Sequence, residues 1–172
     1  GHGHGEYDLH VWLDPINAKV ILKEMTEHLI ENDSKNASTY KSNLDKALND
    51  IDKLTMDVMT ELNESTSSIV FHDAYQYFEH KYNLSNVGSI VVGNNKNYGA
   101  KTISKIQKII QEKQVVCIFE EPQFSSDVVR NIADAGKIKY NYLDIEWGAS
   151  YSGLKPEDYY FAMMKSNADN LV

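Results

Sequence analysis

The sequence predicts an α/β protein with a four-stranded parallel sheet, helices on both faces of that sheet, and a long helix before it. Two observations lead to this fold class. Short apolar segments alternate with helical segments through the second half of the chain, and a much longer stretch of helical periodicity precedes them. Because a helix that connects two parallel strands crosses over in a right-handed sense, the alternation gives a sheet covered on both sides.

The composition is that of an ordinary globular protein and argues against several classes of function. The chain has 172 residues, of which 42% are hydrophobic and 24% charged, which is typical of a folded domain. Its formal net charge of -8 disfavours a broad phosphate-binding surface, so no nucleic-acid partner is expected. Cys117 is the single cysteine. A zinc ion would therefore have to be held by His, Asp or Glu side chains.

The first third of the chain predicts a short strand and two helices. Tyr7 to Trp12 alternates enough for the strand, and Asp14 and Pro15 are typical of the N-cap and first residue of a helix that runs to about Ile30. A second helix is expected from about Asn36 to Leu62, a rod of roughly 40 Å at 1.5 Å per residue. Such a helix could be a strut between two lobes or a core helix along one side of a domain.

The remainder alternates between strands and helices. Its strands are expected over residues 68–71, 87–92, 115–119 and 138–143, and its helices over 74–82, 100–112, 126–135 and 156–170. Each predicted strand is short and apolar, and each predicted helix repeats its apolar residues at spacings of three and four.

Polar residues follow these strands where each strand ends. His72 and Asp73 follow the first strand, Glu120 and Glu121 the third, and Asp144 the fourth. In open parallel sheets the ligand-binding groups collect at the carboxyl ends of the strands. The pattern therefore predicts that His72 and Asp144 lie at one edge and form part of a site.

Each of these residues also has a structural interpretation. His72 could be a hydrogen-bonded core histidine, Asp144 a loop or cap residue, and His10 a strand residue that faces a polar neighbour. His28 and His80 are expected on solvated helix faces. Adjacent carboxylates seldom point at the same substrate, so a structural role is favoured for Glu120 and Glu121.

No pattern in the chain predicts catalysis. There is no phosphate-binding loop, and no Ser or Cys stands in a nucleophile elbow. His2 and His4, in the glycine-rich start, could belong to a mobile loop, to a cloning remnant or to the end of a metal-gathering His-rich loop.

Three motifs resemble those of one family. Residues 10–15 (HVWLDP) resemble an H-x-W-L-x-P motif, residues 71–78 (FHDAYQYF) an F-H-D-A-Y-x-Y-F motif, and residues 116–124 (VCIFEEPQF) a C-I-F-x-E-P-Q-F segment. Asp144 falls where the family has the aspartate of an L-D-P sequence. Together they resemble the cluster A-I (cluster 9) family of ABC-transporter solute-binding proteins, and most of all its ZnuA-type zinc-uptake members.

The resemblance implies two α/β lobes joined by one rigid helix, with a metal ion in the cleft between them. It divides the chain into a remnant of the first lobe (1–33), a linking helix (36–64) and the second lobe (65–172). It also implies that His10 and His72 are direct metal ligands and that Asp144 is an acidic ligand or lies near the ion.

The function that the resemblance implies is capture of zinc in the periplasm and its delivery to an ABC transporter permease, without a catalytic substrate. Zinc is favoured over Mn²⁺ because His72 stands where manganese-type relatives carry Glu, and imidazole nitrogen suits zinc better than manganese. The alternatives are a metal-binding surface adhesin of the same fold and, less favoured, a metallohydrolase, which would need further His and Asp ligands.

Two further expectations concern the site itself. Each ligand histidine should donate its second ring N–H to a carboxylate or carbonyl, for which Asp8 and Glu120 are candidates. The first-lobe histidine that completes the site in the family has no counterpart here. We therefore expect an incomplete site in which residues 1 to about 33 are displaced, mobile or packed against another copy of the chain.

Overall fold

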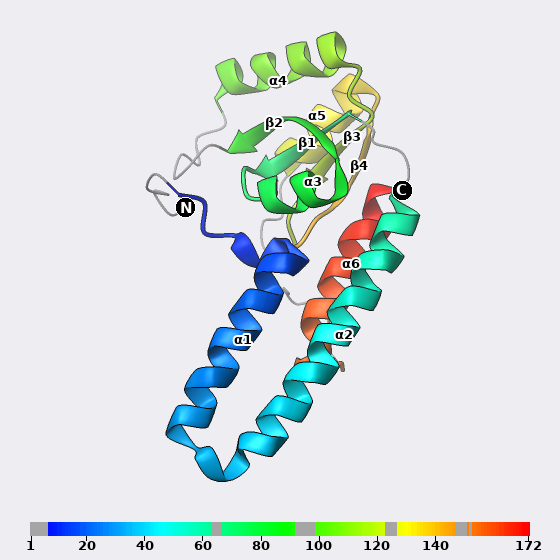
Figure 1. Ribbon diagram of the computed structural model, residues 1–172. Helices are drawn as coiled ribbons and strands as arrows, with labels where there is room; N and C mark the ends of the chain where they lie inside the picture. Colours follow the sequence, from blue (N-terminus) through cyan, green and yellow to red (C-terminus); the bar gives the residue numbers. More distant parts are fainter. Residues whose placement is uncertain (1–6, 63–66, 92–98, 123–126, 147–150, 152) are drawn as a thin grey trace.

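The computed structural model describes residues 7–62, 67–91, 99–122, 127–146, 151 and 153–172. It consists of a sheet with its covering helices and a helical hairpin that projects away from the sheet (Figure 1). The hairpin is formed by α1 (Pro15–Asn32) and α2 (Ala37–Glu61), with the short 3-10 turn η2 (Ser34–Asn36) between them.

The sheet has four parallel strands in the order β2-β1-β3-β4. The strands are β1 (Ser67–His72), β2 (Ser85–Val91), β3 (Cys117–Glu120) and β4 (Lys139–Tyr142). Every strand lies within about two residues of its predicted position, and the predicted fold class is confirmed. The order of the segments explains this result. Short apolar strands separated by amphipathic helices bury both faces of their sheet when the strands are parallel and helices pack on each side.

Alternate strand residues face opposite layers, as a pleated strand requires. Ile69 and Phe71 of β1 belong to one apolar cluster, which they share with α4 (Ala100–Lys113) and α5 (Asp127–Gly136). Val70 belongs to the other cluster, together with residues of α3 (Gln76–Tyr82) and α6 (Tyr159–Leu171), the helix that follows the 3-10 turn η4 (Pro156–Asp158). Helices therefore cover both faces of the sheet.

The predicted strand over Tyr7 to Trp12 is wrong, because residues 11–13 form the 3-10 turn η1 (Val11–Leu13). Leu13 is wholly buried in the cluster that contains α3 and α6, and Trp12 packs against the same cluster. A strand would have pointed these two neighbouring side chains in opposite directions. The predicted N-cap is confirmed, since the Asp14 carboxylate accepts a hydrogen bond from the Ile16 N–H at 2.8 Å.

The long helix α2 is a projecting rod and a core helix at once. Leu54 and Val58, near its C-terminal end, are buried with Met163 and Met164 of α6, and Lys165 forms an ion pair with Glu61. Its N-terminal half lies beside α1, away from the sheet (Figure 1). The division of the chain into residues 1–33, 36–64 and 65–172 stays a prediction.

Several large apolar side chains of α1 are exposed. Ile16, Val20 and Met25 are each more than half exposed, and Leu29 is 46% exposed. Lys19 of the same helix forms an ion pair with Asp52 of α2. The ion pair links the two helices of the hairpin, while several large apolar side chains of α1 remain exposed.

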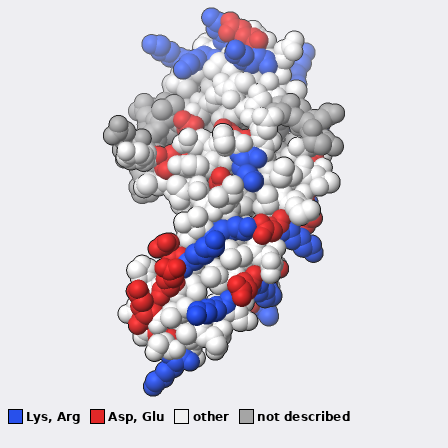
Figure 2. Space-filling view, viewed as in Figure 1, with Lys and Arg blue, Asp and Glu red and all other residues white. Residues whose placement is uncertain are grey.

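Charges are interspersed over the helical hairpin, where basic and acidic side chains alternate (Figure 2). Lysines gather at the opposite end of the molecule, over α4, which contains Lys101, Lys105, Lys108 and Lys113. Among the described helices, none combines the length and apolar character that crossing a membrane demands.

Glu79 on α3 makes the stability of the fold depend on pH. Burial raises the pKa of its carboxyl group to about 7, although a hydrogen bond with Asn86 lowers it in part. Because the pKa in the folded state exceeds the ordinary value of about 4.3, the proton stabilises the folded protein. That stability is fully present below pH ~4.3 and is lost as the pH rises through about 7.

We therefore expect Glu79→Gln to be more stable than the parent protein at pH 8, by on the order of 1 kcal/mol after allowance for solvent screening. The two should differ least at pH 4. Chemical denaturation at a series of pH values measures this, with the exposed Glu112→Gln as the matched control. A parallel pH profile for the parent and Glu79→Gln proteins would contradict the assignment.

Candidate metal centre

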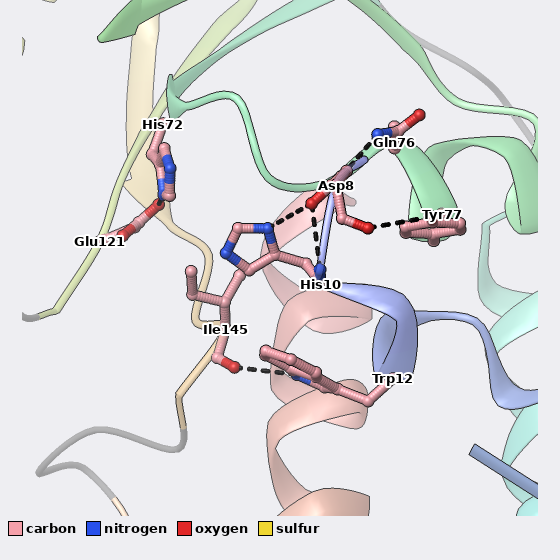
Figure 3. Close-up of polar contacts among 8 residues, drawn as sticks. All are labelled: Asp8, His10, Trp12, His72, Gln76, Tyr77, Glu121 and Ile145. Carbon is pink, nitrogen blue, oxygen red and sulfur yellow. Dashed lines mark hydrogen bonds and ion pairs between the residues drawn. The ribbon is translucent and has the colours of Figure 1, made fainter. Parts of the chain in front are cut away.

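Two histidines from distant parts of the sequence face each other at the carboxyl edge of the sheet. His72 is the last residue of β1, and His10 immediately precedes η1. Their ring centroids are 5.3 Å apart and the rings are nearly perpendicular, at 85°. Figure 3 shows the two side chains approaching each other from these two elements. The structure thus brings together two of the three predicted site residues.

The position of His72 follows from strand alternation. Val70, two residues earlier, faces the layer of α3 and α6. His72 therefore points to the same side, which is the side on which η1 lies. Because His72 is at the end of the strand, its ring lies at the border of the apolar core, and its side chain is 17% exposed.

His10 is held by Asp8. One oxygen of the Asp8 carboxylate accepts from the His10 backbone N–H at 3.0 Å and contacts the ring Nδ1 at 2.6 Å. The other oxygen accepts from the Gln76 side chain at 2.6 Å, and the Asp8 carbonyl accepts from the Tyr77 hydroxyl at 3.1 Å. Burial by itself would raise the pKa of Asp8, but these hydrogen bonds outweigh it and lower that pKa.

Trp12 fastens the other end of the same segment. Its indole N–H donates to the Ile145 carbonyl at 3.1 Å, and its own carbonyl accepts from the Tyr160 hydroxyl at 3.0 Å. Residues 8–13 are thus attached to α3, to α6 and to the loop after β4. The expectation that residues 1 to about 33 are displaced is wrong for this segment, because side-chain hydrogen bonds fix it to the α/β unit and His10 is only 7% exposed.

A second carboxylate, Glu121, accompanies His72. The Glu121 Oε1 lies 3.5 Å from Nδ1 of His72 and accepts from the Tyr75 hydroxyl at 3.4 Å. Hydrogen bonding to Glu121 raises the pKa of His72 against the opposing effect of burial. The expected carboxylate partner Asp8 is therefore present beside His10, whereas the partner of His72 is Glu121 and not Glu120.

The alternation of side chains along the chain explains this correction. Phe119 faces the layer of α3 and α6, so Glu120 points to the other face and Glu121 returns to the side of His72. Glu120 is buried 3.6 Å from the guanidinium of Arg130 on α5. The two adjacent carboxylates therefore have different partners: Glu120 lies beside Arg130 and Glu121 beside His72.

Asp144 lies at the same edge of the sheet, two residues after β4, as predicted. It is 3% exposed, and its Oδ1 accepts from the Glu146 N–H at 2.9 Å. The Asn167 side chain of α6 accepts from the Asp144 N–H at 2.8 Å and donates to its carbonyl at 2.7 Å. Asp144 also lines a polar cavity of about 430 Å³ beside Tyr151 and Ser166.

Within the described ranges, no group of three or more His, Cys, Asp or Glu side chains is arranged to hold a metal ion. His10 and His72 therefore form a facing pair, and Asp144, at the same edge of the sheet, is not grouped with this pair in the described structure. Of the other histidines, His28 is 72% exposed beside Glu31 and His80 is exposed on α3, in agreement with the solvated faces predicted for both. His2 and His4 lie outside the described residues. Metal binding by His10, His72 and Asp144 stays a prediction.

The fold matches solved structures across nearly the whole chain. A mutant of the laminin-binding adhesin Lmb from Streptococcus agalactiae aligns with a TM-score of 0.82 at 21% identity, over 100% of this chain and 66% of that one. A ZnuA crystal structure aligns with a TM-score of 0.78 at 24% identity, over 96% and 62% respectively. The chain therefore shares its fold with these proteins, and the histidine pair lies at the carboxyl edge of its sheet.

The sequence comparisons identify the family. The family model described as zinc-uptake complex component A, periplasmic (ZnuA), matches residues 1–172, and the chain belongs to this family. The high-affinity zinc uptake system protein ZnuA of Brucella abortus is 40% identical over 142 residues, which are 81% of this chain and 42% of that protein. The ZnuA of Yersinia pestis is 32% identical over 145 residues, 83% of this chain and 46% of that protein. The chain spans less than half the length of these relatives.

We expect His72→Ala and His10→Ala each to weaken zinc binding at least tenfold, a loss of about 1.4 kcal/mol or more of binding free energy. Each variant removes one of the two facing imidazoles. Isothermal titration calorimetry measures the change, and His28→Ala and His80→Ala are the controls. Equal losses in all four variants would show that the facing pair is not the site.

Asn167→Ala should destabilise the protein by about 1–3 kcal/mol, because it leaves the buried N–H and carbonyl of Asp144 without their partners. Urea denaturation measures the change. The exposed Asn131→Ala on α5 is the control and should change stability by less than about 0.5 kcal/mol. Equal stabilities of the two variants would show that the amide does not hold the Asp144 loop.

Proposed function

We propose that this chain forms part of a periplasmic protein that captures zinc with high affinity and delivers it to an ABC transporter permease. The observation that supports this most directly is the pair of facing imidazoles, 5.3 Å apart between ring centroids, at the carboxyl edge of a parallel sheet. In this proposal zinc is the cargo, and the protein makes or breaks no covalent bond in it.

The chemistry of the donors favours zinc. Zinc binds about four nitrogen or oxygen ligands in a tetrahedral arrangement, and neutral imidazoles suit it well. In both rings Nδ1 contacts a carboxylate, so Nε2 is the nitrogen that would bind the ion. His10 and His72 would supply two ligands, and the remaining positions would be filled from outside this pair. Asp144 is a candidate for one of them from its place at the same edge.

Delivery to a permease requires an ion that leaves again. The relatives are named as parts of zinc uptake systems, and uptake requires a site that gives up its ion, unlike a closed structural zinc site. The His10 segment is fastened to the same unit as His72, so release would require a change in the ligands outside the pair rather than separation of the two histidines.

Zinc should bind more tightly than Mn²⁺ or Mg²⁺, because at least two donors are imidazole nitrogens. We expect a zinc-loaded sample of the protein to keep its ion in the presence of a hundredfold excess of Mn²⁺. Equilibrium dialysis with metal analysis measures the retained zinc. Stoichiometric displacement of zinc by Mn²⁺ would contradict the proposal.

A further inference from the structure

The structure assigns to Asp8 and Glu121 a shared role: they supply negative charge to the metal centre without supplying oxygen ligands. This inference rests on the proposed zinc site and goes beyond it. It concerns two positioning residues that act through His10 and His72, and it explains how the site attracts a doubly charged cation while it keeps nitrogen donors.

The two carboxylates occupy equivalent places around the histidine pair. Asp8 contacts Nδ1 of His10 at 2.6 Å, and Glu121 lies 3.5 Å from Nδ1 of His72. Both lie behind the ring, on the nitrogen that faces away from an ion bound at Nε2, so each fixes which nitrogen is presented. Both are shielded from water, with side chains 11% and 2% exposed respectively.

Each carboxylate is also restrained so that it cannot easily swing forward to the ion. Asp8 accepts from the His10 backbone N–H and from Gln76. The Tyr75 hydroxyl shares its one proton between the Leu143 carbonyl at 3.0 Å and the Glu121 Oε1 at 3.4 Å. Figure 3 shows Asp8 and Glu121 on different elements, each beside its own histidine.

The charges have a direct consequence. A carboxylate behind each imidazole places negative charge close to the position of a doubly charged zinc ion without adding an oxygen ligand. In a partly buried site such charges interact more strongly than in water. If the same carboxylates were ligands, their oxygen atoms would suit Mn²⁺ and Mg²⁺ as well. Placement behind the imidazoles therefore gives attraction for a divalent ion together with preference for zinc.

The test uses isosteric amides in the same protein that binds zinc. Asp8→Asn and Glu121→Gln remove the charge and keep the shape, and each should lower zinc affinity about 10- to 100-fold. Glu120→Gln is the matched control, because it removes a buried charge from the neighbouring residue on the opposite face. It should change zinc affinity less than threefold, and thermal melts of all variants establish that they are folded.

A second measurement separates a charge behind the ring from a direct ligand. Co²⁺ replaces zinc and reports its ligands through its visible absorption bands. We expect Glu121→Gln and Asp8→Asn to bind Co²⁺ more weakly but with unchanged band positions at saturation, because the donor atoms stay the same. His72→Ala should shift the bands.

The outcomes are distinct. Failure of the full-length protein that contains this chain to bind zinc would overturn the proposed function. Normal zinc binding by the parent protein with unchanged affinity in Asp8→Asn and Glu121→Gln would overturn this inference alone. Shifted Co²⁺ bands in either amide variant would also overturn it, because the carboxylate would then be a ligand.

Discussion

The attachment of residues 8–13 to the carboxyl edge of the sheet is the constraint on which the site depends. Without it, His72 would have no second histidine facing it. The Asp8 carboxylate and the Trp12 indole hold the segment from both ends, the first against α3 and the second against the loop after β4. Leu13, wholly buried, anchors it in the core. A stretch of chain without a strand is thus positioned as firmly as a strand would be.

Much of this arrangement could be predicted from the sequence. The alternation of apolar and amphipathic segments predicts the four parallel strands, and the strand-end rule predicts that His72 and Asp144 share an edge. The N-cap at Asp14 is encoded within a few neighbouring residues. These features are local, or follow from the order of the elements, so a single sequence contains the information.

The remainder depends on contacts between distant residues. The 3-10 turn at residues 11–13 forms because Trp12 and Leu13 meet the same core, which no local pattern reveals. To choose between Glu120 and Glu121, one must know which side chains at the end of strand β3 point to which face of the sheet. An error of one position in this assignment places the wrong carboxylate on the side of His72. Asp144 could be placed at the edge from sequence, but the amide of Asn167, 23 positions further on, could not be foreseen.

X-ray absorption at the zinc edge measures directly whether His10 and His72 share one zinc ion. We expect a shell of nitrogen and oxygen atoms at about 2.0–2.1 Å that includes two imidazoles in the parent protein. His10→Ala and His72→Ala should each lose one of them. A zinc shell without imidazole, or one that neither substitution changes, would show that this pair does not bind the ion.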